Sequence, residues 1–299
     1  MTANLDVLQA WRIPDKVQML TRHDVAFYAL SIGAGRDPCD QTELRFVDPG
    51  RPDLEALPSM ALVLGYPGFW LGNPALKLDI KRIFHVEQSL EIMGALPVEG
   101  RVVGRTWVTD LQDRGVGKDL LVHSRRDVSD ERGVTFAKLR QVHMLRGYGG
   151  FFRGKIDKDV SRPASTPSAS PVAAVVDTVI RTEQALLYRL NGDFNPLHSD
   201  PAVAQAAGFP GPILHGMCTF GMVARKLVKT LCRGEANRLI SMSARFTGPV
   251  HPGETLRTEI LEDGSFHTVS VERGRPVLGY GMARAAPMNV VTLEPHHAI

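Results

Sequence analysis

The 299-residue sequence has few cysteines, little net charge and no long apolar run. Its cysteines, Cys39, Cys218 and Cys232, show neither CxxC nor paired spacing, so we expect reduced thiols and no disulfide framework. A formal net charge of +3 is too small to indicate nucleic-acid binding. Prolines and glycines interrupt the longest apolar stretch, residues 57–71, which stays below the roughly 18 apolar residues of a membrane span. Neither a nucleic acid nor a membrane is therefore an expected partner.

The two ends of the sequence lack common targeting patterns. Residues 1–6 do not show the basic and then apolar pattern of a signal peptide. Residues 294–299 match no peroxisomal or retention signal, and their two histidines fit a frayed polar end better than a metal site. We therefore expect a cytoplasmic protein.

A linker and a repeat organise the chain. Residues 157–171, DKDVSRPASTPSASP, are rich in serine, proline and charge, which is typical of a linker. We expect an N-terminal unit over residues 1–156 and a C-terminal unit over residues 172–299. Residues 24–31 parallel residues 184–191, and each segment is followed by a turn. The sequence therefore predicts a duplicated domain whose two copies pack as a pseudo-dimer.

The C-terminal unit has a readable pattern of elements. Apolar residues at helical spacing over 218–231 predict one amphipathic helix, with Arg225, Lys226 and Lys229 on its surface side. Alternation over 240–246 predicts a half-buried strand. Further strands are expected at residues 256–261, 266–271 and 276–285, joined by tight turns. An antiparallel sheet wrapped around one central helix is the hot-dog arrangement, so the predicted fold is α+β, a double hot dog.

The central helix of the N-terminal unit is expected to be degenerate. Residues 57–64 occupy its place, and Pro67 would cut such a helix short. A short helix leaves room inside the sheet. Either a substrate tail occupies this room, or Phe69, Trp70 and Leu71 fill it as core.

Residues 188–198, YRLNGDFNPLH, carry a carboxylate and an imidazole around a turn. Proline, glycine and asparagine keep this segment out of a helix, so Asp193 and His198 can face one another across a loop. The alternative is that Asp193 and Asn195 only form turns and that His198 is a hydrogen-bonded loop residue. The first interpretation predicts acid/base chemistry.

A second segment, residues 208–217, ends in a glycine that opens the predicted helix. A helix that begins at Gly216 presents free N–H groups and the positive end of its dipole, which suits a developing oxyanion. We expect His215 to pack or cap the helix. A metal site made by His198 and His215 is not expected, because no third ligand stands at a local spacing.

The sequence resembles the MaoC-like, (R)-specific 2-enoyl-CoA hydratases, known as hydratase 2. Residues 188–201 are similar to the hydratase 2 motif, and residues 212–221 are similar to the helix start that forms the oxyanion hole. Residues 28–35 and 146–151 are similar to the first half of the two-domain members. The resemblance implies reversible syn hydration of a trans-2-enoyl-CoA to the (3R)-3-hydroxyacyl-CoA, in fatty-acid or related acyl-CoA metabolism.

The resemblance also implies the roles of individual residues. Asp193 and His198 would hold the reacting water, with the acid and the base left unassigned, and Gly216 N–H would bind the thioester oxygen. Asn195 and Gly192 would support the site. We expect the substrate to arrive as a coenzyme A thioester and no metal or other cofactor to take part. The N-terminal unit is expected to accommodate the acyl tail, and the protein is expected to form a homodimer.

Two other functions fit the same fold. A hot-dog acyl-CoA thioesterase usually places a carboxylate on the central helix, but no Asp or Glu stands between Gly216 and Arg233. A non-catalytic acyl-CoA binding module would keep the motif without turnover.

Overall fold

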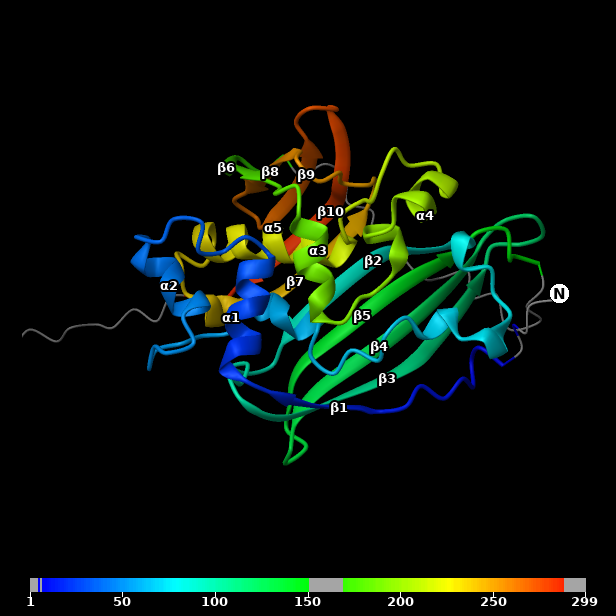
Figure 1. The fold of residues 1–299 in the computed structure, drawn as a ribbon, viewed down its shortest axis with the longest axis horizontal. Helices are drawn as coiled ribbons and strands as arrows, with labels where there is room; N and C mark the ends of the chain where they lie inside the picture. The colour runs from blue at the N-terminus through cyan, green and yellow to red at the C-terminus, as the bar shows by residue number, and fades with distance from the viewer. Residues whose placement is uncertain (1–4, 6, 151–168, 288–299) are drawn as a thin grey trace, which may run out of the picture.

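Ten antiparallel strands form one continuous sheet in the computed structural model, which describes residue 5, residues 7–150 and residues 169–287 (Figure 1). The strand order is β1-β3-β4-β5-β2-β7-β10-β9-β8-β6. The first half of the chain supplies β1 (Lys16–Leu20), β2 (Ile83–Ile92), β3 (Gly100–Asp113), β4 (Leu120–Asp130) and β5 (Thr135–Leu145). The second half supplies β6 (Val172–Val179), β7 (Leu239–Phe246), β8 (Thr255–Leu261), β9 (Ser265–Ser270) and β10 (Arg275–Ala285). The two halves join where β2 pairs with β7, from Glu87 opposite Arg245 to Glu91 opposite Ser241.

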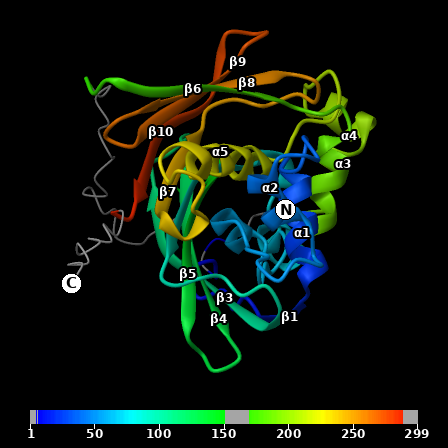
Figure 2. The same ribbon diagram turned by 90° about the vertical axis from the view of Figure 1, so that its left-hand side faces the viewer.

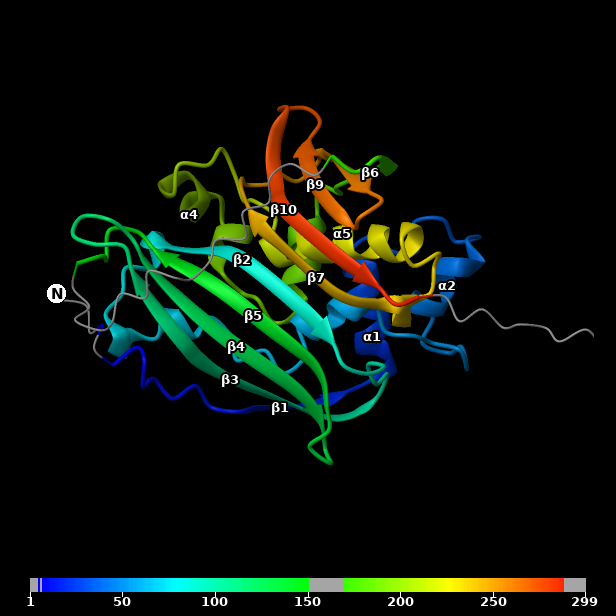
Figure 3. The same ribbon diagram turned by 180° about the vertical axis from the view of Figure 1, so that it is seen from behind.

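The helices lie inside the bend of this sheet (Figure 2). They are α1 (Arg22–Ser31), α2 (Gln41–Val47), α3 (Gln184–Tyr188), α4 (Pro201–Ala206) and α5 (Gly216–Thr230). Short 3₁₀ turns are η1 (Pro58–Leu62), η2 (Trp70–Gly72), η3 (Pro74–Leu76), η4 (Ile80–Arg82), η5 (Arg189–Asn191), η6 (Pro196–His198) and η7 (Ala236–Arg238). From behind, the strands from β10 through β7, β2, β5, β4 and β3 to β1 lie side by side, with no helix in front of them (Figure 3). This architecture confirms the predicted double hot dog.

The central helix α5 and the strands of the second half agree with the sequence patterns. The expected helix over 218–231 is α5, and the four expected strands are β7 to β10. Phe220 and Leu227 of α5 have no exposed surface and belong to the larger hydrophobic core. Burying one such side chain stabilises the fold by roughly 1.5–3 kcal/mol. The 3₁₀ turn η1 of the first half also contacts α5, so both halves of the chain hold this helix in place.

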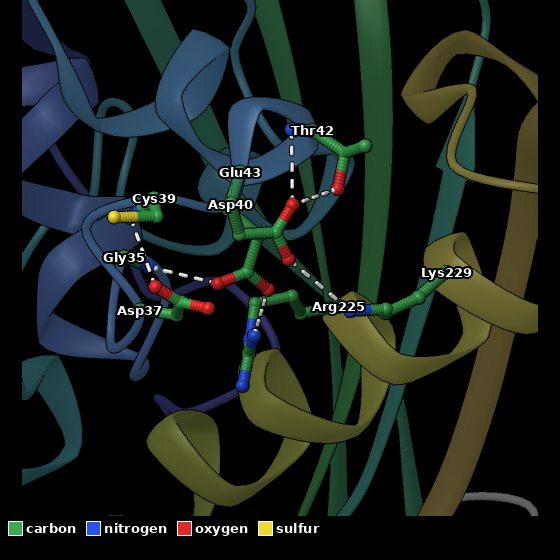
Figure 4. Close-up of polar contacts among 8 residues, drawn as sticks. All are labelled: Gly35, Asp37, Cys39, Asp40, Thr42, Glu43, Arg225 and Lys229. Carbon is green, nitrogen blue, oxygen red and sulfur yellow. Dashed lines mark hydrogen bonds and ion pairs between the residues drawn. The ribbon is translucent and has the colours of Figure 1, made fainter.

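The expected surface position of Arg225 is wrong. Its side chain is 8% exposed, and its Nη1 forms an ion pair with Oε1 of Glu43 on α2 (Figure 4). The second carboxylate oxygen of Glu43 accepts a hydrogen bond of 2.9 Å from Gly35 N–H. Lys229, one turn later on α5, makes a more exposed pair with Asp40 at 3.4 Å. The buried pair therefore ties the helix of one half to the other half of the chain.

The first half has only η1 where the second half has the fifteen-residue α5. The short helix ends at Leu62, before Pro67, because Gly65 adopts a left-handed φ of 55° against β3. A Cβ at Gly65 would lie 2.4 Å from the backbone nitrogen of Gly104, so only glycine fits there. The predicted degenerate helix is thus confirmed, but the glycine rather than the proline ends it.

The duplication extends to the helices that precede each turn. Tyr28 of α1 and Tyr188 of α3 are both fully buried, and their rings meet edge to face with centroids 6.5 Å apart. The predicted unit boundaries at residues 156 and 172 stay predictions, and most of the predicted linker, residues 157–168, lies outside the described residues. No helix in the described part of the chain is long and apolar enough to span a membrane.

The core of the first half is divided into two parts. The large cluster around α5 includes Leu57, Met60 and Leu62 of the η1 region. A smaller separate cluster contains Leu71 and Leu120 at the far end of the sheet. Leu71 therefore fills core, as one of the two interpretations expected, whereas Phe69 is 37% exposed and does not.

Candidate active site

The loop between α3 and α4 carries the predicted acid/base pair. Gly192 ends η5 in a left-handed conformation with φ 108°, which an L side chain adopts only with strain. Asp193 Oδ1 accepts a bond of 3.3 Å from Asn195 N–H, and Asn195 Oδ1 caps η6 by accepting 3.1 Å from Leu197 N–H. These turns fix the backbone between Asp193 and His198. The supporting roles predicted for Asn195 and Gly192 stay predictions, although both residues shape this loop.

A hydrogen bond to the main chain of Ile213 holds the His198 ring in one orientation. Its Nδ1 lies 2.8 Å from the carbonyl oxygen of Ile213. A carbonyl can only accept, so Nδ1 carries the proton in the neutral ring and Nε2 presents a lone pair. Burial lowers the pKa of His198, although the bond to Ile213 and the charge of Asp193 oppose this effect. The imidazole is therefore neutral near pH 7.

His215 packs against the pair, as expected. It is 1% exposed and stacks on His198 with ring centroids 3.8 Å apart. Its Nε2 lies 3.2 Å from the main-chain oxygen of Asp193, so this nitrogen donates and fixes the loop. Burial, together with neighbouring His198, lowers the pKa of His215 to about 2. His215 is thus a neutral side chain that positions Asp193.

The three side chains converge on one small space. One carboxylate oxygen of Asp193 and one ring nitrogen each of His198 and His215 lie within 4.8 Å of one another. The expectation that the histidines lack a third metal-type ligand is therefore wrong, because Asp193 supplies one. Two hydrogen bonds of about 2.8 Å to one water span a similar distance. The space can hold either a water molecule or a cation.

Gly216 begins α5, as predicted. The first N–H groups of a helix have no intrahelical acceptor and lie at the positive end of its dipole. A Cβ at Gly216 would lie 3.0 Å from the ring of Phe246, so a larger residue would press against β7. The residue before Gly216, His215, contacts the main-chain oxygen of Asp193, so α5 begins beside the loop that carries Asp193.

A cavity of about 420 Å³ adjoins this loop on the side of the first half. The second half contributes Leu190, Asn191, Gly192 and Phe194, and the first half contributes Lys16, Gln18, Asp24, Phe27, Met60, Val63, Tyr66, Pro67 and Gly68. This cavity is therefore part of the space inside the sheet that the short η1 does not fill. Tyr66, which lines this cavity, lies outside the two segments that carry the predicted acid/base pair and helix start.

We expect the pH dependence of activity to report the protonation of His198. Because burial lowers its pKa below the ordinary value near 6.5, the neutral ring persists as the pH falls to about 6.5 and protonates only below it. We expect kcat/KM to be level near neutral pH and to fall on an acid limb whose midpoint lies below about 6.5. A pH–rate profile checks this, and a midpoint well above that value contradicts it.

A ten-stranded antiparallel sheet that bends around the central helix α5, with Asp193 and His198 close to the helix start, is the arrangement of the MaoC-like double hot-dog class. The comparisons with known proteins agree. Residues 19–147 match the MFE-2 hydratase 2 N-terminal domain, and residues 163–278 match the MaoC like domain. The chain therefore belongs to the MaoC-like hydratase 2 family, in its two-domain form.

Individual relatives cover nearly the whole chain. The chain is 36% identical to "Enoyl-CoA hydratase 2, peroxisomal" of Arabidopsis thaliana, over 93% of this chain and 94% of that protein. It is 34% identical to "Probable enoyl-CoA hydratase 2" of Dictyostelium discoideum, over 90% and 92%. The crystal structure of a MaoC-like dehydratase from Phytophthora capsici superposes with a TM-score of 0.80 at 29% identity, covering 95% of this chain and 99% of that one.

Proposed function

We propose that this protein is a 2-enoyl-CoA hydratase that adds water reversibly to a trans-2-enoyl-CoA and forms the (3R)-3-hydroxyacyl-CoA. The observation that carries the proposal is the convergence of Asp193 and His198 within 4.8 Å, beside the first residue of α5. Relatives named enoyl-CoA hydratase 2 support the same reaction.

The tautomer of His198 suggests how the pair divides the work. Water bound between Asp193 and His198 loses a proton to the free Nε2 as its oxygen attacks the β-carbon. The pair then returns one proton to the α-carbon on the same face, so the elements of one water are added. Asp193 accepts the second hydrogen bond of that water and holds it in place.

Gly216 N–H serves the other end of the reacting system. Attack at the β-carbon drives negative charge onto the thioester oxygen, and a helix N-terminus aimed at that oxygen stabilises the enolate. The acyl chain would occupy the cavity against η1, where Phe27, Met60 and Val63 provide apolar walls. The shortened helix of the first half is what makes this cavity possible.

The test is direct. Mixing the protein with crotonyl-CoA or a longer enoyl-CoA should bleach the absorbance of the conjugated thioester, and chiral analysis should find the (3R) product. Release of free thiol without hydration would instead identify a thioesterase. Tight acyl-CoA binding without either reaction would identify a binding module.

We also propose that no metal ion or other cofactor takes part. Acid/base chemistry by Asp193 and His198 needs none, even though these residues and His215 resemble a metal ligand set. Treatment with a chelator should leave the hydration rate unchanged. Elemental analysis of the treated protein checks that it holds no metal. Loss of activity that added Zn²⁺ or Mn²⁺ restores would contradict this. A cytoplasmic location and a homodimer remain further proposals.

A further inference from the structure

Arg126 is a buried arginine on β4, a central strand of the first half (Figure 1). Its side chain points to the concave face of the sheet, and the residue is 2% exposed. Only one nitrogen has partners among the described residues. That nitrogen, Nη2, donates to the main-chain oxygens of Leu62 and Ala61 at the end of η1.

The remaining donors of Arg126 have no acceptor among the described residues. Both Nε and Nη1 are buried and unpartnered there, and no carboxylate is among the groups that act on this guanidinium. Burial lowers the pKa of Arg126 to about 10, so the group stays charged at neutral pH. A buried charge without a counterion is costly, because desolvation of an ion in a protein interior takes several kcal/mol.

Capping of η1 explains only part of this arrangement. Basic groups do stabilise the carbonyls at a helix end. However, Nη2 alone meets both carbonyls, and a lysine would do so without the further buried N–H donors on Nε and Nη1. The unsatisfied side of the guanidinium therefore requires another explanation.

Arg126 lies in a band of buried polar groups that separates the two hydrophobic clusters. Thr106 lies opposite Arg126 in the strand register, and Ser124 is its neighbour on the same face. Thr106 Oγ1, Ser124 Oγ and His143 Nδ1 are also buried without a partner among the described residues. An apolar acyl tail would leave these buried polar groups without hydrogen bonds, whereas a tail that carries oxygen atoms could bond to them.

Tyr66 connects this band to the cavity beside the catalytic loop. The Arg126 guanidinium lies 5.3 Å from the ring centroid of Tyr66, which lines the cavity beside Gly192. The Tyr66 ring therefore lies between the guanidinium of Arg126 and the cavity that would hold the acyl chain.

We propose that Arg126 binds a free carboxylate carried by the acyl chain of the substrate. The preferred substrates are then 2-enoyl-CoA thioesters of dicarboxylic acids. Thr106, Ser124 and His143 would form hydrogen bonds to the polar end of the chain, directly or through water. This specificity rests on the proposed hydration. It follows from the charge and the free donors of Arg126, which a methyl-ended chain leaves unmatched.

Matched substrate pairs test the proposal. Each pair has one chain length and ends either in a methyl group or in a carboxylate, such as trans-2-hexenoyl-CoA and trans-2-hexenedioyl-CoA, with longer pairs of eight and ten carbons. At the best length we expect kcat/KM to favour the carboxylate at least tenfold. Arg126→Gln should lower kcat/KM for that substrate about a hundredfold, mainly through KM, since one partner of a buried charge pair is lost. The methyl-ended substrate should change by less than about threefold.

Two variants control for structure. Arg126→Lys keeps the charge and should retain part of the preference. Arg125→Gln changes the neighbouring side chain on the opposite face, which pairs with Asp127 at 2.9 Å, and should leave the preference intact. An equal loss for both substrates in Arg126→Gln, or a wild-type enzyme without preference, overturns the proposal and leaves Arg126 as a cap of η1.

Binding separates this inference from the reaction. Calorimetric titration with the saturated thioesters hexanoyl-CoA and hexanedioyl-CoA, and their longer homologues, needs no turnover. Tighter binding of a carboxylate form that Arg126→Gln abolishes would support the site even if no enoyl-CoA is hydrated. Equal binding of both forms at every length would refute it even if hydration is found.

Discussion

Asp193→Asn is expected to lower the hydration rate of crotonyl-CoA by at least about a hundredfold, the usual minimum for a positioned acid or base. Asparagine keeps the shape of the side chain and an oxygen that can accept from Asn195 N–H. The bond from His215 goes to the main-chain oxygen of Asp193 and is unaffected. The substitution therefore removes the charge and little else. His198→Ala should have a similar effect, and stopped-flow absorbance at the thioester band measures both.

The two losses should not add. Residues that act on one water lose their joint function when either is removed, so the double variant should be about as slow as the worse single variant. Asp200→Asn is a matched control, because Asp200 is exposed and caps α4 through Ala202 N–H at 2.8 Å, which asparagine also does. If Asp200→Asn is as slow as Asp193→Asn, the pair is not the catalytic centre.

The residues of this pair could be predicted because their geometry is encoded locally. Asp193 and His198 are five positions apart, and Gly192, Asn195 and Pro196 determine the turn between them whatever the rest of the fold does. Gly216 was likewise identified from the glycine that precedes a periodic apolar run. In each case the signal and the structure that it predicts lie within one short segment.

Other parts depend on contacts that no local pattern contains. Glu43 and Arg225 are 182 residues apart, and α5 is buried on almost every side because both halves enclose it. The sequence pattern of α5 alone does not show that the first half of the chain covers the polar face of this helix. Arg126 left a fainter signal: it interrupts the inward row of β4, where Leu120, Val122 and Val128 are apolar.

Glu43→Gln is expected to lower the free energy of unfolding by about 3–5 kcal/mol, since it leaves Arg225 charged and buried without its partner. Glutamine keeps an oxygen for Gly35 N–H, so the loss reports the ion pair rather than that hydrogen bond. Arg225→Met should cost a comparable amount, because it leaves the buried carboxylate of Glu43 without its ion-pair partner. Denaturant unfolding followed by circular dichroism measures both.

The double variant Glu43→Gln/Arg225→Met decides whether the charges themselves are responsible. With neither charge present, no ion remains buried, so the double variant should be more stable than either single one. Lys229→Met, one turn along the same helix, removes an exposed pair and should change stability by only a small fraction of that loss. If both single variants match Lys229→Met, the buried pair does not hold α5 to the first half, and the apolar contacts between α5 and η1 must do so alone.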